Sequence, residues 1–192
     1  MSSSMLTQYA LANSLKKFML TIPINRIHVR MLTDDCGLTR HTFYNHFRDV
    51  YDLLGWVYDR EVVDGLDQYC TREKWPQGIE LVLQYTAQNR VICLNTFRSL
   101  GRDHLEGFLY RVFYQLIRNV VDDIARKMRL SEENKQECCG FYANALVGVF
   151  IAWLKDDLRE SPEHMADLID RIMSGNIVHS LEKYDAKAKS RG

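Results

Sequence analysis

One stretch of the chain, residues 36–54, constrains the fold more than any other, because several local signals follow one another there. Gly37 can adopt the positive φ angle that ends a helix, and Thr39 is a good N-cap for a helix that follows. Phe43 and Phe47 lie one helical turn apart, so we expect both on a single buried face. The pattern predicts a helix, a tight turn and a short helix with polar outer faces, followed by a third helix with an acidic cap.

The remainder of the chain shows a helical repeat of apolar residues. Three prolines and ten glycines in 192 residues leave long windows without a helix breaker. We predict an all-α fold of about nine helices and see no strand pattern. The ends, residues 1–4 and 185–192, are expected to be disordered. The expected helices cover residues 5–21, 29–35, 39–46, 49–69, 79–89, 91–99, 103–128 and 131–158, and a last one begins at Pro162.

Charge is distributed unevenly along the chain, although its net charge is zero. Residues 1–50 contain six Lys or Arg and three Asp or Glu, a net charge of +3, which leaves −3 for the other residues. Three of the six histidines also lie in this first segment. A basic N-terminal segment on an acidic body suits contact with a phosphate backbone, and a short helix with polar outer faces suits the major groove of DNA.

Several classes of protein are disfavoured by what the sequence lacks. The five cysteines have no Cys-x-x-Cys spacing, and we expect a reduced, cytoplasmic protein without a metal site. No secretory signal is visible, and the longest nearly apolar run, residues 141–154, is too short to cross a bilayer, so no membrane partner is expected. None of the common catalytic motifs is present, and we predict neither an enzyme nor a bound cofactor.

The helix that contains residues 141–154 favours self-association. Only Asn144 is strongly polar in this run, so no outer face is reserved for water. It is either the central helix of a monomeric core or a helix shared between its own core and a twin subunit. We favour the twin subunit, because small residues recur on one side of the helix and a two-fold interface would cover them. The predicted dimer interface consists of Ala145, Gly148, Ala152 and Trp153.

The first 55 residues resemble the DNA-binding segment of the TetR/AcrR family of bacterial transcriptional regulators. The resemblance rests on Gly37, on the run Thr42-Phe43-Tyr44-Asn45-His46-Phe47, and on Asp49 followed by Leu53-Leu54. The C-terminal half is similar to the subgroup that contains the dihydroxyacetone kinase operon activator, in Phe141–Gly148, Trp153-Leu154 and Ser161-Pro162-Glu163. The resemblance implies an all-α homodimer with a helix-turn-helix domain (residues 1–50) that binds a palindromic operator in double-stranded DNA. It also implies a ligand-sensing and dimerisation domain (residues 51–184) that binds a small-molecule effector or a partner protein.

Two positions depart from the family pattern. His28 stands where many members have a Thr or Ser that caps the second helix and touches a phosphate. Val50 stands where many have a Lys beside the DNA backbone, and Arg48 is the obvious substitute. An alternative hypothesis is therefore a protein that keeps the fold and acts through other proteins, but has lost operator binding.

The predicted DNA-binding residues divide by role. Arg40 and His41 are candidates for base edges, since Arg can grip guanine O6 and N7 together. Tyr44, His46 and Arg48 should hold the phosphate backbone, as the resemblance implies for the tyrosine. Each of them would otherwise be part of a solvated helix face. The complete set is His28, Thr39, Arg40, His41, Thr42, Tyr44, Asn45, His46 and Arg48.

The effector site gives a weaker signal. Aromatic residues recur on the helices expected between residues 79 and 128, although such residues are also typical of a packed core. His104 lies near a helix N-terminus, which favours an anionic ligand, although a capped turn explains it equally well. The predicted effector-binding residues are Tyr85, Phe97, His104, Phe108 and Phe113.

Overall fold

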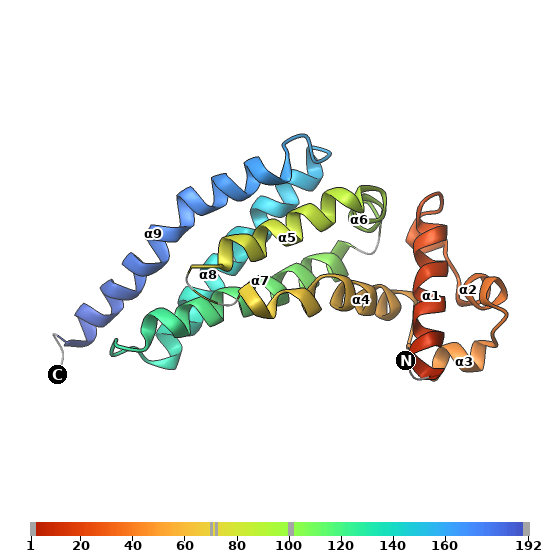
Figure 1. Ribbon diagram of the computed structural model, residues 1–192, viewed down its shortest axis with the longest axis horizontal. Coiled ribbons are helices and arrows are strands. Elements are labelled where there is room, and N and C mark those ends of the chain that lie inside the picture. The colour runs from red at the N-terminus through yellow and green to blue at the C-terminus, as the bar shows by residue number, and fades with distance from the viewer. Residues whose placement is uncertain (1–2, 70, 72, 100–101, 190–192) are drawn as a thin grey trace. The chain divides into compact units, whose positions relative to one another are not determined.

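The computed structural model describes residues 3–69, 71, 73–99 and 102–189. These residues form nine α-helices and three short 3-10 helices with no strand, which confirms the predicted all-α class (Figure 1). The α-helices are α1 (Ser3–Met19), α2 (Val29–Cys36), α3 (Arg40–Tyr44), α4 (Val50–Glu61), α5 (Trp75–Gln88), α6 (Arg90–Phe97), α7 (Arg102–Ala125), α8 (Glu132–Lys155) and α9 (Pro162–Lys189). The 3-10 helices are η1 (Ile24–Arg26), η2 (Val63–Gly65) and η3 (Asp67–Tyr69).

Several helix ends differ from the sequence prediction. Helix α4 ends at Glu61, and two 3-10 turns replace its expected last two turns. Helix α5 begins at Trp75, because Pro76 in the first turn needs no backbone donor. Helix α1 already begins at Ser3, and α9 continues through Lys189, so the described residues of both ends that were expected to be disordered are helical, and residues 1, 2 and 190–192 lie outside the described part of the chain. Asp185 holds the end of α9 by accepting hydrogen bonds from the Arg129 amide (2.8 Å) and Lys189 (2.6 Å).

The chain forms two compact units. Unit 1 consists of residues 1–61 together with residues 89–105, and unit 2 consists of residues 62–88 and 106–192. Unit 1 therefore contains the whole predicted DNA-binding segment, α4, α6 and the first turn of α7. The predicted DNA-binding domain, residues 1–50, is smaller than unit 1, and its boundary at residue 50 stays a prediction.

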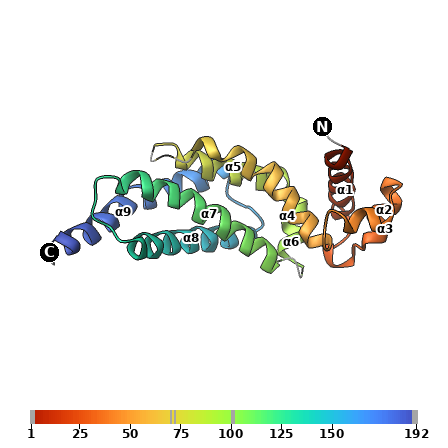
Figure 2. The same ribbon diagram turned by 90° about the horizontal axis from the view of Figure 1, so that it is seen from below.

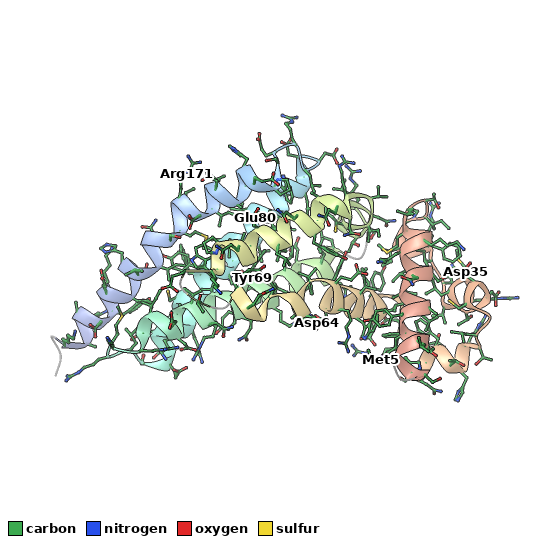
Figure 3. All side chains as sticks on the ribbon, viewed as in Figure 1. Met5, Asp35, Asp64, Tyr69, Glu80 and Arg171 are labelled. Atoms are coloured by element: carbon green, nitrogen blue, oxygen red, sulfur yellow. The ribbon has the colours of Figure 1, made fainter. Side chains whose placement is uncertain are left out.

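Unit 1 is built around the buried face of α1. Leu11 and Leu15 are fully buried, as is Leu32 of α2, because the apolar positions of both helices recur at helical spacing. Asp35 of α2 links the same two helices on the surface, where it accepts hydrogen bonds from Ser14 (2.8 Å) and Lys17 (2.5 Å) of α1 (Figure 3). The hydrogen bond from Lys17 is the main reason that the pKa of Asp35 is lowered.

In unit 2, α5 lies against α9, and α8 packs on α9 (Figures 1 and 2). A side chain at Gly78 would stand 3.1 Å from Tyr69 Cβ and 3.2 Å from a methyl group of Leu116. Only glycine therefore fits here without displacing its neighbours. Burial raises the pKa of Cys138 to about 11 and that of Cys139 to about 12, so neither thiol is reactive at neutral pH.

Helix α8 is the most apolar long helix among the described residues. The apolar run within it is short, but the complete helix is long and apolar enough to cross a bilayer by length and composition, with a mean hydropathy of 1.5 over 18 residues. Half of that window is buried inside the protein. The core helix of a soluble protein has these same properties, so the composition of α8 alone is weak evidence for a membrane.

Candidate nucleic-acid interface

The turn before α3 has the geometry that the sequence predicts. Gly37 has φ 65° and ψ 30°, and the Leu38 amide donates to the Thr33 carbonyl at 2.8 Å. This pair of features ends α2 and turns the chain. Thr39 Oγ1 then accepts a hydrogen bond from the Thr42 amide at 3.1 Å and caps α3. The position of the short helix is thus fixed by its own turn and cap.

Two aromatic side chains attach α3 to the core. Phe43 is fully buried and Phe47 nearly so, with their ring centroids 5.8 Å apart. The Phe47 ring also meets Trp56 of α4 edge to face, at 6.0 Å. Tyr44, by contrast, is 58% exposed. A five-residue helix held from beneath by aromatic rings can present its polar side chains without other support.

The start of α4 is capped twice. Asp49 accepts a hydrogen bond from the Asp52 amide at 2.8 Å, and Asp52 in turn accepts one from the Arg48 amide at 2.9 Å. The arrangement is a variant of the capping box, in which the second hydrogen bond comes from the amide of the residue before the N-cap and not from the N-cap itself. The Arg48 amide is the main reason that the pKa of Asp52 is lowered. The Arg48 guanidinium pairs with Asp52 at 3.3 Å, yet its side chain is 88% exposed, so it is oriented but available to solvent.

The predicted DNA-binding residues meet at a hollow of about 390 Å³ in unit 1, which we call the basic hollow. It lies where the N-terminal turns of α2 and α4 meet one flank of α3. Three arginines and a histidine line it, against a single carboxylate. Helix N-termini and arginines both favour an anion, so the basic hollow has the chemistry of a phosphate site. Its lining residues are Ile24, Asn25, Ile27, His28, Val29, Arg30, Arg40, Tyr44, Arg48, Asp49, Val50 and Tyr51.

Four of the nine predicted DNA-binding residues line the basic hollow, namely His28, Arg40, Tyr44 and Arg48. The other five do not. His41 and Asn45 are exposed, and the helical spacing puts them opposite the buried phenylalanines. The hydroxyl groups of Thr39 and Thr42 lie 2.8 Å apart within the cap. His46 is half-buried against Phe47.

The prediction omitted several residues that line the basic hollow, among them Asn25, Arg30 and Tyr51. Arg30 is mostly exposed and pairs with Asp34 at 3.4 Å. A cation in the first turn of α2 was a usable signal, because that turn follows the predicted cap residue His28. Tyr51 gave no such signal, since the ring on which it stacks belongs to His104, which is distant in the chain.

The predicted effector residues are divided between the two units. Phe97 and His104 lie in unit 1, where Arg102 stacks over the Phe97 ring (5.1 Å) and His104 stacks on Tyr51. Tyr85, Phe108 and Phe113 lie in unit 2, and Phe113 is fully buried against Phe150. Two hollows are described in unit 2, and these residues line neither of them. The described residues include no cluster of three or more His, Cys, Asp or Glu that could hold a metal ion.

Three of the four predicted interface residues are on the outer face of α8. Ala145, Gly148 and Ala152 are exposed, and a Cβ atom at Gly148 would have no neighbour within 4 Å. Phe141 precedes them on the same face and is 70% exposed. Trp153 is different: it is buried in its own subunit, and its indole N–H donates to the Glu160 carbonyl at 2.9 Å. Its ring is therefore part of the core and offers no surface to a partner.

The turn between α2 and α3, with its short capped second helix, defines a helix-turn-helix fold, and the comparisons with known proteins identify the family of the chain. Residues 73–175 match the family TetR_C_8, described as a transcriptional regulator C-terminal region. The chain belongs to the TetR family of transcriptional regulators, and the proteins it resembles are regulators and not enzymes.

The individual relatives have low sequence identity to this chain. The HTH-type dhaKLM operon transcriptional activator DhaS of Lactococcus lactis subsp. lactis (strain IL1403) is 23% identical over 151 residues, which is 78% of this chain and 80% of that protein. The solved structure of the dihydroxyacetone kinase operon activator DhaS has a TM-score of 0.69 at 20% identity, covering 94% of this chain and 99% of that one.

A second similar structure is that of a repressor. Native NalD, the secondary repressor of the MexAB-OprM multidrug efflux pump in Pseudomonas aeruginosa, has a TM-score of 0.63 at 14% identity, covering 93% of this chain and 98% of that one. These structures show the fold, which is shared by an activator and a repressor. The fold therefore does not decide the direction of regulation.

Proposed function

We propose that this protein is a cytoplasmic regulator that binds a palindromic operator in double-stranded DNA as a homodimer. Residues 1–50 form its DNA-binding domain, and residues 51–184 form a domain that dimerises and binds a small-molecule effector or partner protein. The basic hollow carries the proposal, because it gathers Arg30, Arg40 and Arg48 at two helix N-termini beside a short exposed helix. A DNA backbone presents the anions that such a site favours.

The outer face of α3 would read the sequence. Arg40 opens the helix, and His41 and Asn45 are exposed on the side away from its buried rings. Phosphates held in the basic hollow would fix the register of this face on the duplex, and base edges would then be read by hydrogen bonds. The Tyr44 hydroxyl and Arg48 are best placed for the backbone, since both line the basic hollow.

The outer face of α8 supports the dimer. It presents Phe141, Ala145, Gly148 and Ala152 to solvent, an apolar and small-residue surface that a second copy would cover. A two-fold dimer would place its recognition helices about 34–36 Å apart, or a multiple of that. The operator is then an inverted repeat.

The test is selection from a pool of random duplexes, followed by salt titration of the selected duplex. We expect an inverted repeat to be enriched and log affinity to fall linearly with log salt concentration. The double variant Arg30→Ala/Arg48→Ala should lose most of the affinity. Its matched control, Arg126→Ala/Arg171→Ala, removes two similarly exposed arginines of unit 2 and should bind like the wild type. Equal losses in both double variants would contradict a role for the basic hollow.

The second candidate is a TetR-type regulator that has lost operator binding and acts through other proteins. Two observations favour it. The His28 side chain makes no capping hydrogen bond to α2, and Val50 is buried and provides no cation at the start of α4. Selection that enriches no sequence, together with affinity that does not respond to salt, would establish this candidate in place of the first.

A further inference from the structure

Two walls of the basic hollow are held by one segment outside the predicted DNA-binding domain. This segment, residues 89–105, contains α6 and the first turn of α7, and it belongs to unit 1. In the chain it is preceded and followed by residues of unit 2. Each of its two relevant contacts ends on a residue that lines the basic hollow, so the segment bears directly on the proposed DNA site.

The first contact is made by Asn95 of α6. Its amide nitrogen donates to the carbonyls of Met19 and Ile22, both at 2.7 Å, and its amide oxygen accepts from the Ile24 backbone N–H at 2.9 Å. One side chain thus ties the end of α1 to the start of η1. Ile24 is buried and lines the basic hollow, and the chain continues from it to His28 at the N-terminus of α2.

The second contact is made by His104 in the first turn of α7. Its imidazole stacks on the Tyr51 ring, with the centroids 4.6 Å apart and the planes within 4° of parallel. Tyr51 lines the basic hollow and directly follows Val50, the first residue of α4. The stack therefore fixes the wall formed by the N-terminal turn of α4, next to Arg48.

We propose that Asn95 and His104 are positioning residues for DNA binding. Neither lines the basic hollow, and both act through residues that do. Asn95 holds the side that leads to α2, and His104 holds the side formed by α4. Phosphate contacts depend on the distance between the two helix N-termini, so releasing either wall lowers affinity for any duplex. This inference rests on the proposed function, and it changes the role of His104 from an effector contact to a support of the DNA site.

The experiment compares four variants on the selected operator and on a scrambled duplex, well below the thermal midpoint of each. His104→Ala and Asn95→Ala should each weaken binding to both duplexes roughly fivefold or more, which corresponds to about 1 kcal/mol of binding free energy. His104→Phe keeps a flat ring against Tyr51 and should restore affinity. Thr96→Val is the matched control, because it removes a buried hydrogen bond between α6 and α4 (Thr96 to Tyr58, 3.0 Å) whose two residues lie away from the basic hollow.

The control separates positioning from general stability. Thr96→Val should lower the thermal midpoint and leave affinity unchanged. Amide hydrogen exchange at Ile24 and Tyr51 should accelerate in the Asn95 and His104 variants respectively, but not in Thr96→Val. Wild-type affinity in His104→Ala, or an equal loss of affinity in Thr96→Val, would overturn the positioning role alone. A wild-type protein that binds neither duplex would overturn the proposed function and this role with it.

Discussion

The basic hollow of unit 1 and the outer face of α8 in unit 2 are both exposed, but they have opposite chemistry. The basic hollow presents cations, hydroxyl groups and helix N-termini, and its side chains are oriented by caps and by the Arg48–Asp52 pair. The face of α8 presents methyl groups, a bare glycine and the Phe141 ring. Burying the cations of the basic hollow is unfavourable unless an anion replaces their water. Burying the face of α8 against another apolar surface is favourable, because it removes apolar area from water.

The two surfaces are also built in different ways. At the basic hollow, three short-range features (the Gly37 turn, the Thr39 cap and the Asp49 cap) set the local backbone conformation that carries the polar groups. On α8, the positions of the exposed side chains are set by one long helix. The opposite face of this helix, which includes Cys139, Ala143 and Leu146, is buried. Changes at the basic hollow should therefore alter recognition of DNA, and changes on α8 should alter subunit assembly.

The largest effect is expected from Gly148→Leu on the face of α8. The site is open within one subunit, so the fold should tolerate the new side chain. A two-fold interface contains the new leucine twice, once from each subunit. Overpacking costs about 1–3 kcal/mol at each leucine, so the association free energy should weaken by about 2–6 kcal/mol. Sedimentation should show a dimeric wild type and a largely monomeric variant at micromolar concentration.

The control for this change is Gly107→Leu, which places the same side chain at an exposed, open glycine of α7. It should remain dimeric. A wild-type monomer at micromolar concentration would refute the assignment of the α8 face to a second copy, and so would a Gly148→Leu dimer as tight as the wild type.

The next largest effect is expected from Arg40→Ala. If Arg40 grips a guanine, the variant should lose about 1–3 kcal/mol per half-site and relax preference at one base position. Binding to the operator and to a scrambled duplex would be compared by anisotropy. Since Arg40 also lines the basic hollow, an equal loss on both duplexes would assign it to the phosphate backbone instead.

The features that sequence reasoning predicted correctly depend on neighbours in the chain. The positive φ of Gly37, the Thr39 cap and the burial of Phe43 and Phe47 follow from rules that span at most five residues. The all-α class follows from helical periodicity in the same way.

The features that it missed depend on residues far apart in the chain. Asn95 reaches Met19 across 76 residues, and no local pattern marks either position. The stack of His104 on Tyr51 joins residues 53 positions apart, and it is equally invisible to any local pattern. Trp153 illustrates a different limit: a residue of a nearly apolar run can face inward or outward, and its burial and its hydrogen bond to the Glu160 carbonyl show that it faces inward.

A smaller but more specific effect should separate Arg48 from Tyr44 within the basic hollow. Arg48→Ala should weaken binding to every duplex and reduce the slope of log affinity against log salt by about one, because one phosphate contact no longer releases a counterion. Tyr44→Phe should also weaken binding to all sequences, but it should leave the slope nearly unchanged, because a neutral hydroxyl displaces no counterion. Salt titrations of both variants provide the measurement, and identical slopes would contradict the assignment of Arg48 to a phosphate.

The smallest effect concerns the acid sensitivity of the cap that orients Arg48. Because the folded pKa of Asp52 is lowered, its contribution to stability is present above the unfolded pKa of about 3.9 and is lost as pH falls through the folded value. Asp52→Asn keeps an acceptor for the Arg48 amide but loses the charge at the helix N-terminus, so it should cost only about 0.5–1 kcal/mol at pH 7. Denaturant unfolding of both proteins should show this gap in free energy constant down to about pH 5 and shrinking below about pH 4. A gap that stays the same down to the acid limit would mean that the Asp52 charge contributes nothing to the cap, and that the amide hydrogen bond alone orients Arg48.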